Sequence, residues 1–314
     1  MKVKNLPRIT VVCLLTLAAT LNARAWDGTG HMLVSQIAYD RLTDKARARV
    51  DELASKIQKN GVPYNGVNIA CWADDIKGRD SDSPFRGEFR PWHYIDIGCS
   101  PADPDELSNP PTLSTTNGNI LVALTHCVDL IKNKQTDALI PNESVAMALV
   151  IHFVGDIHQP LHTTGRYDPE THKQNDAGGN GVPVANFAQS QWPPNLHTFW
   201  DEAYRRYYEN GDVKALPPIT ESDPPGSPAR KEWLKTLEPY APKDPNLKYD
   251  VKGWAMESHE IACKQVYGTL GSPYGAKDVK LTEEYVKAGT DTARRQIVLA
   301  GYRLAALLND LYGK

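Results

Sequence analysis

The densest set of potential metal ligands in this chain lies in residues 152–162, which read His-Phe-Val-Gly-Asp-Ile-His-Gln-Pro-Leu-His. His152 and Asp156 are four residues apart, so on a helix their side chains share one face. Pro160 ends such a helix and lets His162 turn toward a different point. Imidazole nitrogen and carboxylate oxygen are ligands that zinc prefers, so this segment predicts a metal site.

A second pair with the same spacing, His197 and Asp201, follows later in the chain. Two such pairs and a separate histidine predict a site with more than one zinc ion. His158 lies two residues past Asp156 and therefore points to another helix face, which predicts a structural role. Other candidate ligands stand earlier in the chain, namely His31, Asp74 and His93.

The amino terminus has the three parts of an export signal. A Lys-rich start precedes an apolar run over residues 9–21, and Ala23-Arg-Ala25 forms a cleavage site before Trp26. We therefore predict that residues 1–25 are removed, that 26–314 form a single domain, and that the protein is secreted or periplasmic. An uncleaved membrane anchor is the alternative. Cleavage removes four basic residues and no acid, which changes the formal net charge from −3 to about −7 and argues against nonspecific DNA packaging.

Four cysteines remain after cleavage: Cys71, Cys99, Cys127 and Cys263. An even number in an exported chain predicts two disulfides, with free buried thiols as the alternative. No Cys-x-x-Cys pair occurs, which disfavours a zinc site made of cysteines.

Apolar periodicity predicts an all-α fold, because no convincing series of alternating strands appears. Capping is expected from Asp44, Asn142 and Asn195; Asn142 also begins a glycosylation acceptor pattern, but the cap is preferred. Long loops are predicted over 163–194 and 216–246. The expected helices cover 29–42, 44–57, 118–131, 144–157, a segment that starts near 196, 251–267 and 282–311.

Five ordered patterns give the chain a resemblance to a known family. They are Trp26-x4-His31, Trp72-Ala-Asp74, His93-Tyr-Ile-Asp96, the segment 152–162, and Asn195-Leu-His-x-x-Trp-Asp201. Together they resemble the zinc-dependent nucleases of the S1/P1 type, which are single-strand-specific endonucleases and 3′-nucleotidases distantly related to zinc phospholipases C. The resemblance implies a single helical domain of the phospholipase C type with long loops.

The resemblance also implies three zinc ions. One would be bound by Asp74, His93, His152 and Asp156, and a second by His162, His197 and Asp201. The third would take His31, Asp156 and the amino and carbonyl groups of Trp26, so that Asp156 bridges two ions. The amine of Trp26 is free only after signal cleavage, which would couple export to activation.

The implied reaction is hydrolysis of RNA, single-stranded DNA and 3′-nucleotides, with 5′-phosphate products from the polymers. Asp74 is expected to orient the attacking water or accept its proton. Lys77 stands where relatives usually carry arginine, and it either contacts phosphate or is a solvated helix lysine. Tyr94 is expected to stack on a base, with a core aromatic as the alternative, and Asp96 to accept hydrogen bonds from the base.

The resemblance further implies a Cys99–Cys263 disulfide, which leaves Cys71 and Cys127 as the second pair. A monomer without stable membrane association is expected. Two other readings remain open at this point: a zinc phospholipase C, and an exported zinc-binding protein without catalytic activity.

Overall fold

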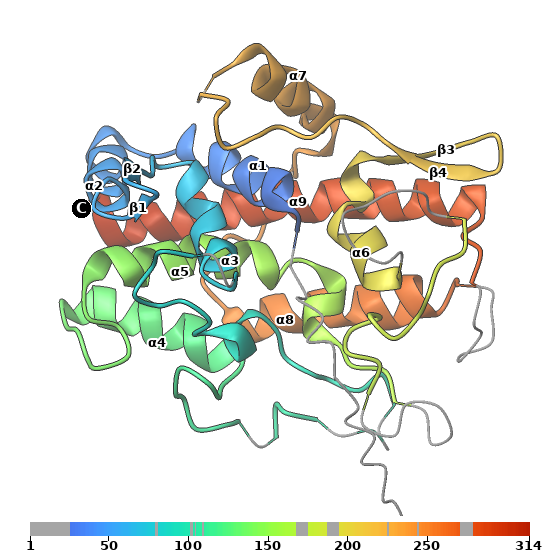
Figure 1. Ribbon diagram of the computed structural model, residues 1–314, viewed down its shortest axis with the longest axis horizontal. Coiled ribbons are helices and arrows are strands. Elements are labelled where there is room, and N and C mark those ends of the chain that lie inside the picture. Colours follow the sequence, from blue (N-terminus) through green and yellow to red (C-terminus); the bar gives the residue numbers. More distant parts are fainter. Residues whose placement is uncertain are drawn as a thin grey trace, which may run out of the picture.

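The computed structural model describes residues 26–78, 81–100, 103, 105–108, 110–167, 175–186, 195–224, 226–243, 245–270 and 279–314. The predicted signal peptide lies outside these residues. The longest helix, α9 (Glu283–Tyr312), crosses the molecule, and α1 (Gly28–Tyr39) packs along it (Figure 1). No helix in the described ranges is long and apolar enough to cross a membrane.

A second helical layer lies beside α9 and contains the most buried helix of the fold (Figure 1). This helix, α5 (Glu143–Asp156), packs against α4 (Ile120–Asn133), and every residue from 144 to 156 is buried. A helix that is apolar on all sides is typical of the centre of a domain. The two polar side chains at its C-terminal end, His152 and Asp156, are therefore placed inside the molecule.

The remaining elements are short and surround these helices. The predicted all-α fold is confirmed, with only two small hairpins in the described part of the chain. The α-helices are α2 (Asp44–Ala54), α3 (Trp72–Asp75), α6 (Leu196–Asp201), α7 (Pro228–Leu237) and α8 (Val251–Ile261). Single turns of other helix types cover Asn68–Cys71, Arg90–His93, Pro160–Thr163, Ala203–Arg205, Glu238–Tyr240 and Ala262–Tyr267.

Both hairpins are antiparallel and turn on an Asn-Gly dipeptide. Strands β1 (Gln58–Lys59) and β2 (Val62–Pro63) flank Asn60-Gly61, and β3 (Arg206–Glu209) and β4 (Asp212–Ala215) flank Asn210-Gly211. All four turn residues have positive φ angles, which is the geometry of the tight turn that Asn-Gly favours.

The predicted caps are mostly confirmed. The side chain of Asn142 accepts a hydrogen bond from the Val145 N–H at 3.0 Å, and Asn195 accepts one from Thr198 at 2.8 Å. The prediction for Asp44 was wrong, because the hydroxyl of Thr43 caps α2 and Asp44 is its first residue. The predicted loop over 216–246 was also wrong in part, because it contains α7.

One of the two predicted disulfides is present. Cys99 and Cys263 are bonded across 164 residues, whereas Cys71 and Cys127 are free and buried. The expected Cys71–Cys127 bond was therefore wrong. Cys71 lies against α1, with its sulfur 3.6 Å from the Gly28 carbonyl oxygen, and Cys127 is packed within α4. An even count of cysteines says nothing about whether two of them are close enough to pair.

Peptide mapping without reductant is expected to recover Cys99 and Cys263 in one linked fragment. Cys71 and Cys127 should react with an alkylating reagent only after the protein is unfolded, because both thiols are buried. In the chain-entropy model, closing a loop of this length stabilises the fold by about 5 kcal/mol. Recovery of a linked Cys71–Cys127 fragment from native protein would contradict this assignment.

Candidate metal centre

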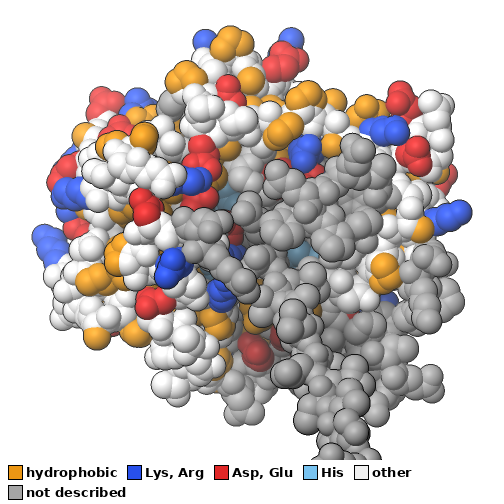
Figure 2. All heavy atoms as spheres, viewed as in Figure 1, with side chains coloured by type: hydrophobic (Ala, Val, Ile, Leu, Met, Phe, Trp, Pro, Cys, Tyr) orange, Lys and Arg blue, Asp and Glu red, His pale blue; other side chains and the backbone are white. Residues whose placement is uncertain are grey.

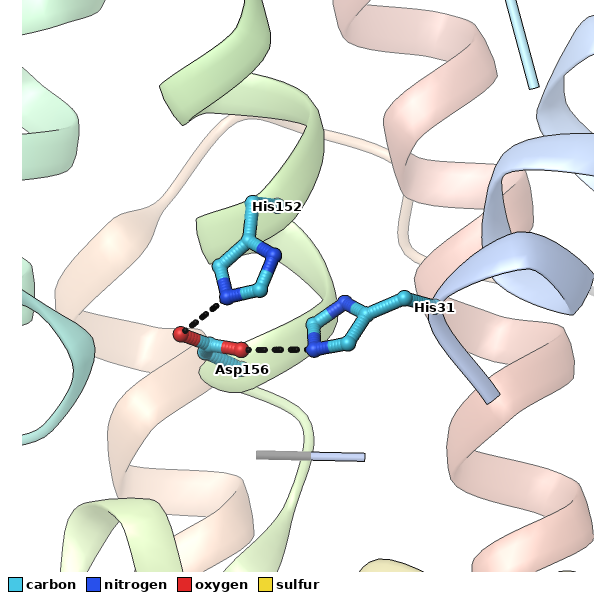
Figure 3. Close-up of side chains that lie close together, drawn as sticks. All are labelled: His31, His152 and Asp156. Atoms are coloured by element: carbon cyan, nitrogen blue, oxygen red, sulfur yellow. Dashed lines mark ion pairs between the residues drawn. The ribbon is translucent and has the colours of Figure 1, made fainter. Parts of the chain in front are cut away.

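The C-terminal turn of α5 presents His152 and Asp156 on one helix face, and His31 of α1 lies opposite them (Figure 3). Asp156 contacts both histidines: its Oδ1 lies 3.2 Å from His31 Nε2, and its Oδ2 lies 3.3 Å from His152 Nε2. The two helices meet closely at Gly155, where a Cβ atom would lie 2.9 Å from His31 Nδ1. The absence of a side chain there lets α1 bring His31 to Asp156.

Two further side chains reach the same place from the segments before α4. Asp74 comes from α3, and His93 ends the turn Arg90–His93. His93 Nδ1 lies 2.9 Å from Asp156 Oδ2 and 3.0 Å from His152 Nε2, and Asp74 Oδ1 lies 3.7 Å from His152 Nε2. His152 and Asp156 thus stand between the ligand candidates of two neighbouring groups.

A third group forms on the far side of Pro160. His162 lies in the turn Pro160–Thr163, while His197 and Asp201 are one turn apart on α6. The Nε2 atoms of His162 and His197 are 3.2 Å apart, and His197 Nε2 is 3.6 Å from Asp201 Oδ1. The structure therefore assembles three buried groups whose donor atoms lie within 4.8 Å of one another: His31, His152 and Asp156; Asp74, His93 and His152; and His162, His197 and Asp201.

Backbone carbonyls fix the ring orientation of three of these histidines. The Nδ1–H groups of His152, His162 and His197 donate to the carbonyls of residues 70, 93 and 178 at 2.6, 2.7 and 2.7 Å. A carbonyl can only accept, so in the neutral ring each Nε2 carries a lone pair that faces the group. Two such lone pairs 3.2 Å apart, on His162 and His197, repel each other unless a cation lies between them. This is the arrangement that metal-binding histidines have in proteins, and it fits zinc.

The pKa values of two carboxylates in these groups, Asp156 and Asp201, are shifted in opposite directions. Burial by itself would raise the pKa of Asp156, but His152 and hydrogen bonds from His31 and His93 hold this pKa well below its usual range. Burial raises the pKa of Asp201 well above its usual range, and a hydrogen bond from Gln159 at 2.6 Å opposes this only in part. A bound cation would keep Asp201 ionised.

Two ring nitrogens in these groups have no hydrogen-bond partner although they are buried. They are Nε2 of His93 and Nδ1 of His31. Buried polar atoms without partners cost free energy, so a cluster of them indicates a ligand site. The donor set of imidazole nitrogens and carboxylate oxygens selects a metal ion as that ligand.

Lys77 is part of this centre and not a solvated helix lysine. Its Nζ lies 2.6 Å from Asp74 Oδ1, both side chains are only 6% exposed, and Lys77 follows the end of α3. Burial alone would raise the pKa of Asp74, but Lys77 and the neighbouring histidines lower it below the usual range. Asp74 is therefore a charged acceptor whose orientation Lys77 fixes.

A cavity of about 210 Å³ opens beside the third group. Tyr94 is 38% exposed at this cavity, so the alternative of a core aromatic was wrong. Burial, followed by repulsion from Glu106, raises the pKa of Asp96 to about 6. The cavity is lined by Tyr94, Asp96, Leu161, His162, Asn175, Ala177, Gly178, Asn180 and His197. Tyr94 and Asp96 thus line the same cavity as His162 and His197.

Trp26, the first described residue, is buried against the C-terminal end of α5 and the ring of Tyr204. Its indole N–H donates to the Gly155 carbonyl at 2.9 Å, and the next residue, Asp27, donates its N–H to the Asp201 carbonyl at 3.1 Å. The Asp27 carboxylate caps α1 and is held by Arg205 Nε at 3.1 Å. The start of the predicted mature chain is therefore fixed next to two of the three groups.

His158 lies outside all three groups, as the helix-face argument predicts. Its Nδ1–H donates to the Val154 carbonyl at 2.7 Å, and its Nε2 accepts from Arg303 at 2.9 Å. Burial and the Arg303 charge lower its pKa to about 3. These contacts give His158 a structural role in joining α5 to α9.

Three further side chains of the centre were not predicted from the sequence: Gln159, Asp27 and Asn175. Gln159 holds Asp201, Asp27 anchors the start of α1, and Asn175 donates to Asp96 at 2.7 Å. The partners of Gln159 and Asn175 are 42 and 79 residues away, so spacing alone carries no signal for them. Asp27 accepts from the Gly30 N–H three residues later, which is a local capping signal that was not used. On the surface, histidine atoms are visible near the middle of the face in Figure 2, where basic and acidic side chains are interspersed.

Comparison with known proteins gives consistent matches over nearly the full chain. A family model described as S1/P1 Nuclease matches residues 26–313. The chain is 28% identical to Nuclease S1 of Aspergillus oryzae, over 97% of this chain and 98% of that protein. It is 24% identical to Endonuclease 2 of Arabidopsis thaliana, over 96% of each, and 24% identical to Nuclease P1 of Penicillium citrinum, over 92% of this chain and 98% of that protein.

Proposed function

Because the chain belongs to the S1/P1 nuclease family and is therefore a phosphodiester hydrolase, we propose that it is a zinc-dependent endonuclease of RNA and single-stranded DNA. Its products would carry 5′-phosphates, and it would also act as a 3′-nucleotidase. The observation that carries this proposal is the arrangement of three buried His/Asp groups beside a cavity with Tyr94 and Asp96.

Three zinc ions fit the three groups. The proposed ligands are Trp26, His31 and Asp156; Asp74, His93, His152 and Asp156; and His162, His197 and Asp201. Bound zinc supplies positive charge against the phosphate oxygens and lowers the pKa of a bound water. The buried lone pairs described above, on His162 and His197 especially, support this assignment.

The remaining side chains of the centre orient the reacting groups. Asp74 accepts a hydrogen bond from the attacking water, because Lys77 keeps its carboxylate charged and fixed. Lys77 also balances phosphate charge, but its ammonium is a point charge and lacks the two-pronged geometry of arginine. We therefore assign Asp74 to water orientation and Lys77 to phosphate contact.

Tyr94 and Asp96 account for a preference for single strands. The ring of Tyr94 is exposed at the cavity and can stack on any base, while the carboxylate of Asp96 accepts hydrogen bonds from base N–H groups. Both contacts need a base that has left its stack, and bases of a duplex are not available in this way.

Export completes the proposal. Cleavage after Ala25 would release the protein to the periplasm or the exterior and expose the amine of Trp26 as a ligand. The buried position of Trp26 beside Gly155 supports its role. We propose a monomer without stable membrane association, because every group of the centre comes from one chain.

The purified, signal-cleaved protein should be assayed on RNA, single-stranded DNA, duplex DNA and a 3′-mononucleotide, with and without a zinc chelator. We expect acid-soluble products from RNA and single-stranded DNA, much slower release from duplex DNA, phosphate from the mononucleotide, and no activity with chelator. Release of phosphocholine from lecithin without nucleotide release would instead identify a phospholipase C.

Substrate affinity is expected to depend on the ionisation of Asp96. The pKa of this carboxyl is raised to about 6, so it is charged above this pH and becomes protonated as the pH falls through it. The KM for substrates whose bases donate N–H groups should therefore rise below about pH 6. An Asp96→Asn variant should lack this step in KM, and a wild-type KM that is constant across the range would contradict the role of Asp96.

A further inference from the structure

The carboxylate of Asp96 is held by the side chain of Asn175, which lines the same cavity. The Nδ2 of Asn175 donates to Asp96 Oδ2 at 2.7 Å, and its Oδ1 accepts from the Ala177 N–H at 2.7 Å. Both ends of the amide are thus engaged within the protein. Asn175 can hold Asp96 in one orientation without itself reading the base.

The backbone next to Asn175 is fixed by a buried clamp. Asp176 is 1% exposed; its N–H donates to the Arg166 carbonyl at 2.9 Å, and its Oδ1 accepts from the Arg166 N–H at 3.0 Å. The other oxygen, Oδ2, accepts from the Tyr267 hydroxyl at 2.8 Å. This clamp joins the segment of Asn175 to the helical turn that carries Cys263, so Asn175 has a fixed position relative to the cavity.

With this orientation, Asp96 presents carboxylate oxygens to a base and no hydrogen. Guanine complements such a group, because its N1–H and its amino group are adjacent donors. Adenine and cytosine carry a ring-nitrogen acceptor next to their amino group, which would place a lone pair against the carboxylate. Uracil and thymine offer one N–H between two carbonyl oxygens. Hydrogen bonds to a charged group are the stronger kind, so a missing donor is costly.

We propose that Asn175 is a positioning residue that sets the base preference of this cavity, by holding Asp96 as an acceptor that selects guanine. This inference rests on the proposed function and names the substrate base that the site prefers. The hydrogen bonds of Asn175 go to Asp96 and Ala177, which lie outside the three His/Asp groups, so its loss should alter base discrimination and leave metal content unchanged.

The test compares hydrolysis of the dinucleotides GpU and ApU at about pH 8, where Asp96 is ionised. The wild type should have a kcat/KM for GpU about tenfold above that for ApU, because one additional hydrogen bond to a charged group changes binding by about this factor. Asn175→Leu should bring this ratio close to one, mainly through KM for GpU, with unchanged zinc content. Asn133→Leu, an exposed position at the end of α4, is the matched control and should keep the wild-type ratio.

A second measurement needs no variant: guanosine, the nucleoside released from GpU, should inhibit the wild type about tenfold more strongly than adenosine. Equal inhibition by the two nucleosides, or an unchanged GpU/ApU ratio in Asn175→Leu, would overturn the inference and leave the nuclease function intact. If the zinc-loaded wild type hydrolysed neither dinucleotide, the proposed function would fail and this inference with it.

Discussion

Replacement of Asp156 by asparagine is expected to lower zinc content and to reduce turnover on single-stranded DNA by well over about 10²-fold. Loss of a residue that only supports a metal ligand costs up to about 10²-fold, and Asp156 is proposed to be a ligand itself. The carboxylate of Asp156 contacts His31 through one oxygen, and His93 and His152 through the other. An amide keeps the shape of the side chain but removes the charge and one acceptor oxygen. One substitution should therefore disturb two of the three groups.

His158→Ala is the matched control, because His158 lies two residues away in the same segment and outside all three groups. Its removal leaves a cavity and takes one hydrogen-bond partner from Arg303, so thermal stability should fall while zinc content and most of the activity remain. Zinc content, measured by mass spectrometry, and initial rates should be compared between the two variants and the wild type. Full zinc and near-normal turnover in Asp156→Asn would refute the bridging role, and equal damage in His158→Ala would refute the helix-face argument.

The parts of the centre that periodicity predicts are those on regular helices. His152 with Asp156, and His197 with Asp201, are one turn apart on α5 and α6, and their shared faces follow from helix geometry alone. How these pairs combine with His31, Asp74 and His93 depends on packing between distant segments. That combination came from the resemblance to a family, since spacing along the chain carries no such information.

Two other local signals were present in the sequence but not used. Asn60-Gly61 and Asn210-Gly211 are strong hairpin signals, and both hairpins form at them. Ser227-Pro228 is a typical helix start, with serine as the cap and proline at the first position, and α7 begins there. This start was not predicted, because the proline content of residues 216–246 favoured a loop over the whole segment.

The free thiols of Cys71 and Cys127 had no local signal at all. Whether two cysteines pair depends on the distance and direction of their Cβ atoms, which only the tertiary structure sets. The same holds for Asn175, whose contact with Asp96 spans 79 residues. Single hydrogen bonds of this kind determine the fine geometry of a site but leave no periodic pattern in the chain.

A protein that begins with a retained methionine before Trp26 is expected to lose zinc from one of the three groups. Its turnover should fall at least about 10²-fold, which is the effect of losing one electrostatic contact to the reacting centre. The indole of Trp26 is bound to the Gly155 carbonyl, and Asp27 is bound to the Asp201 carbonyl, so contacts on both sides fix the backbone of Trp26. An added residue leaves these contacts possible but converts the amine of Trp26 into a peptide nitrogen, which has no basic lone pair for a metal.

The effect should be reversible, which separates the role of the amine from damage to the fold. If a specific protease removes the added methionine after purification, zinc content and turnover should return to those of the signal-cleaved protein. Metal analysis before and after cleavage gives the first comparison, and the rate on single-stranded DNA gives the second. Full activity with three zinc ions in the extended protein would show that the amine is not a ligand, and the groups centred on His152 and His162 would stand without it. Restoration by cleavage would instead show that removal of the export signal completes the metal centre, because the ligand does not exist in the precursor.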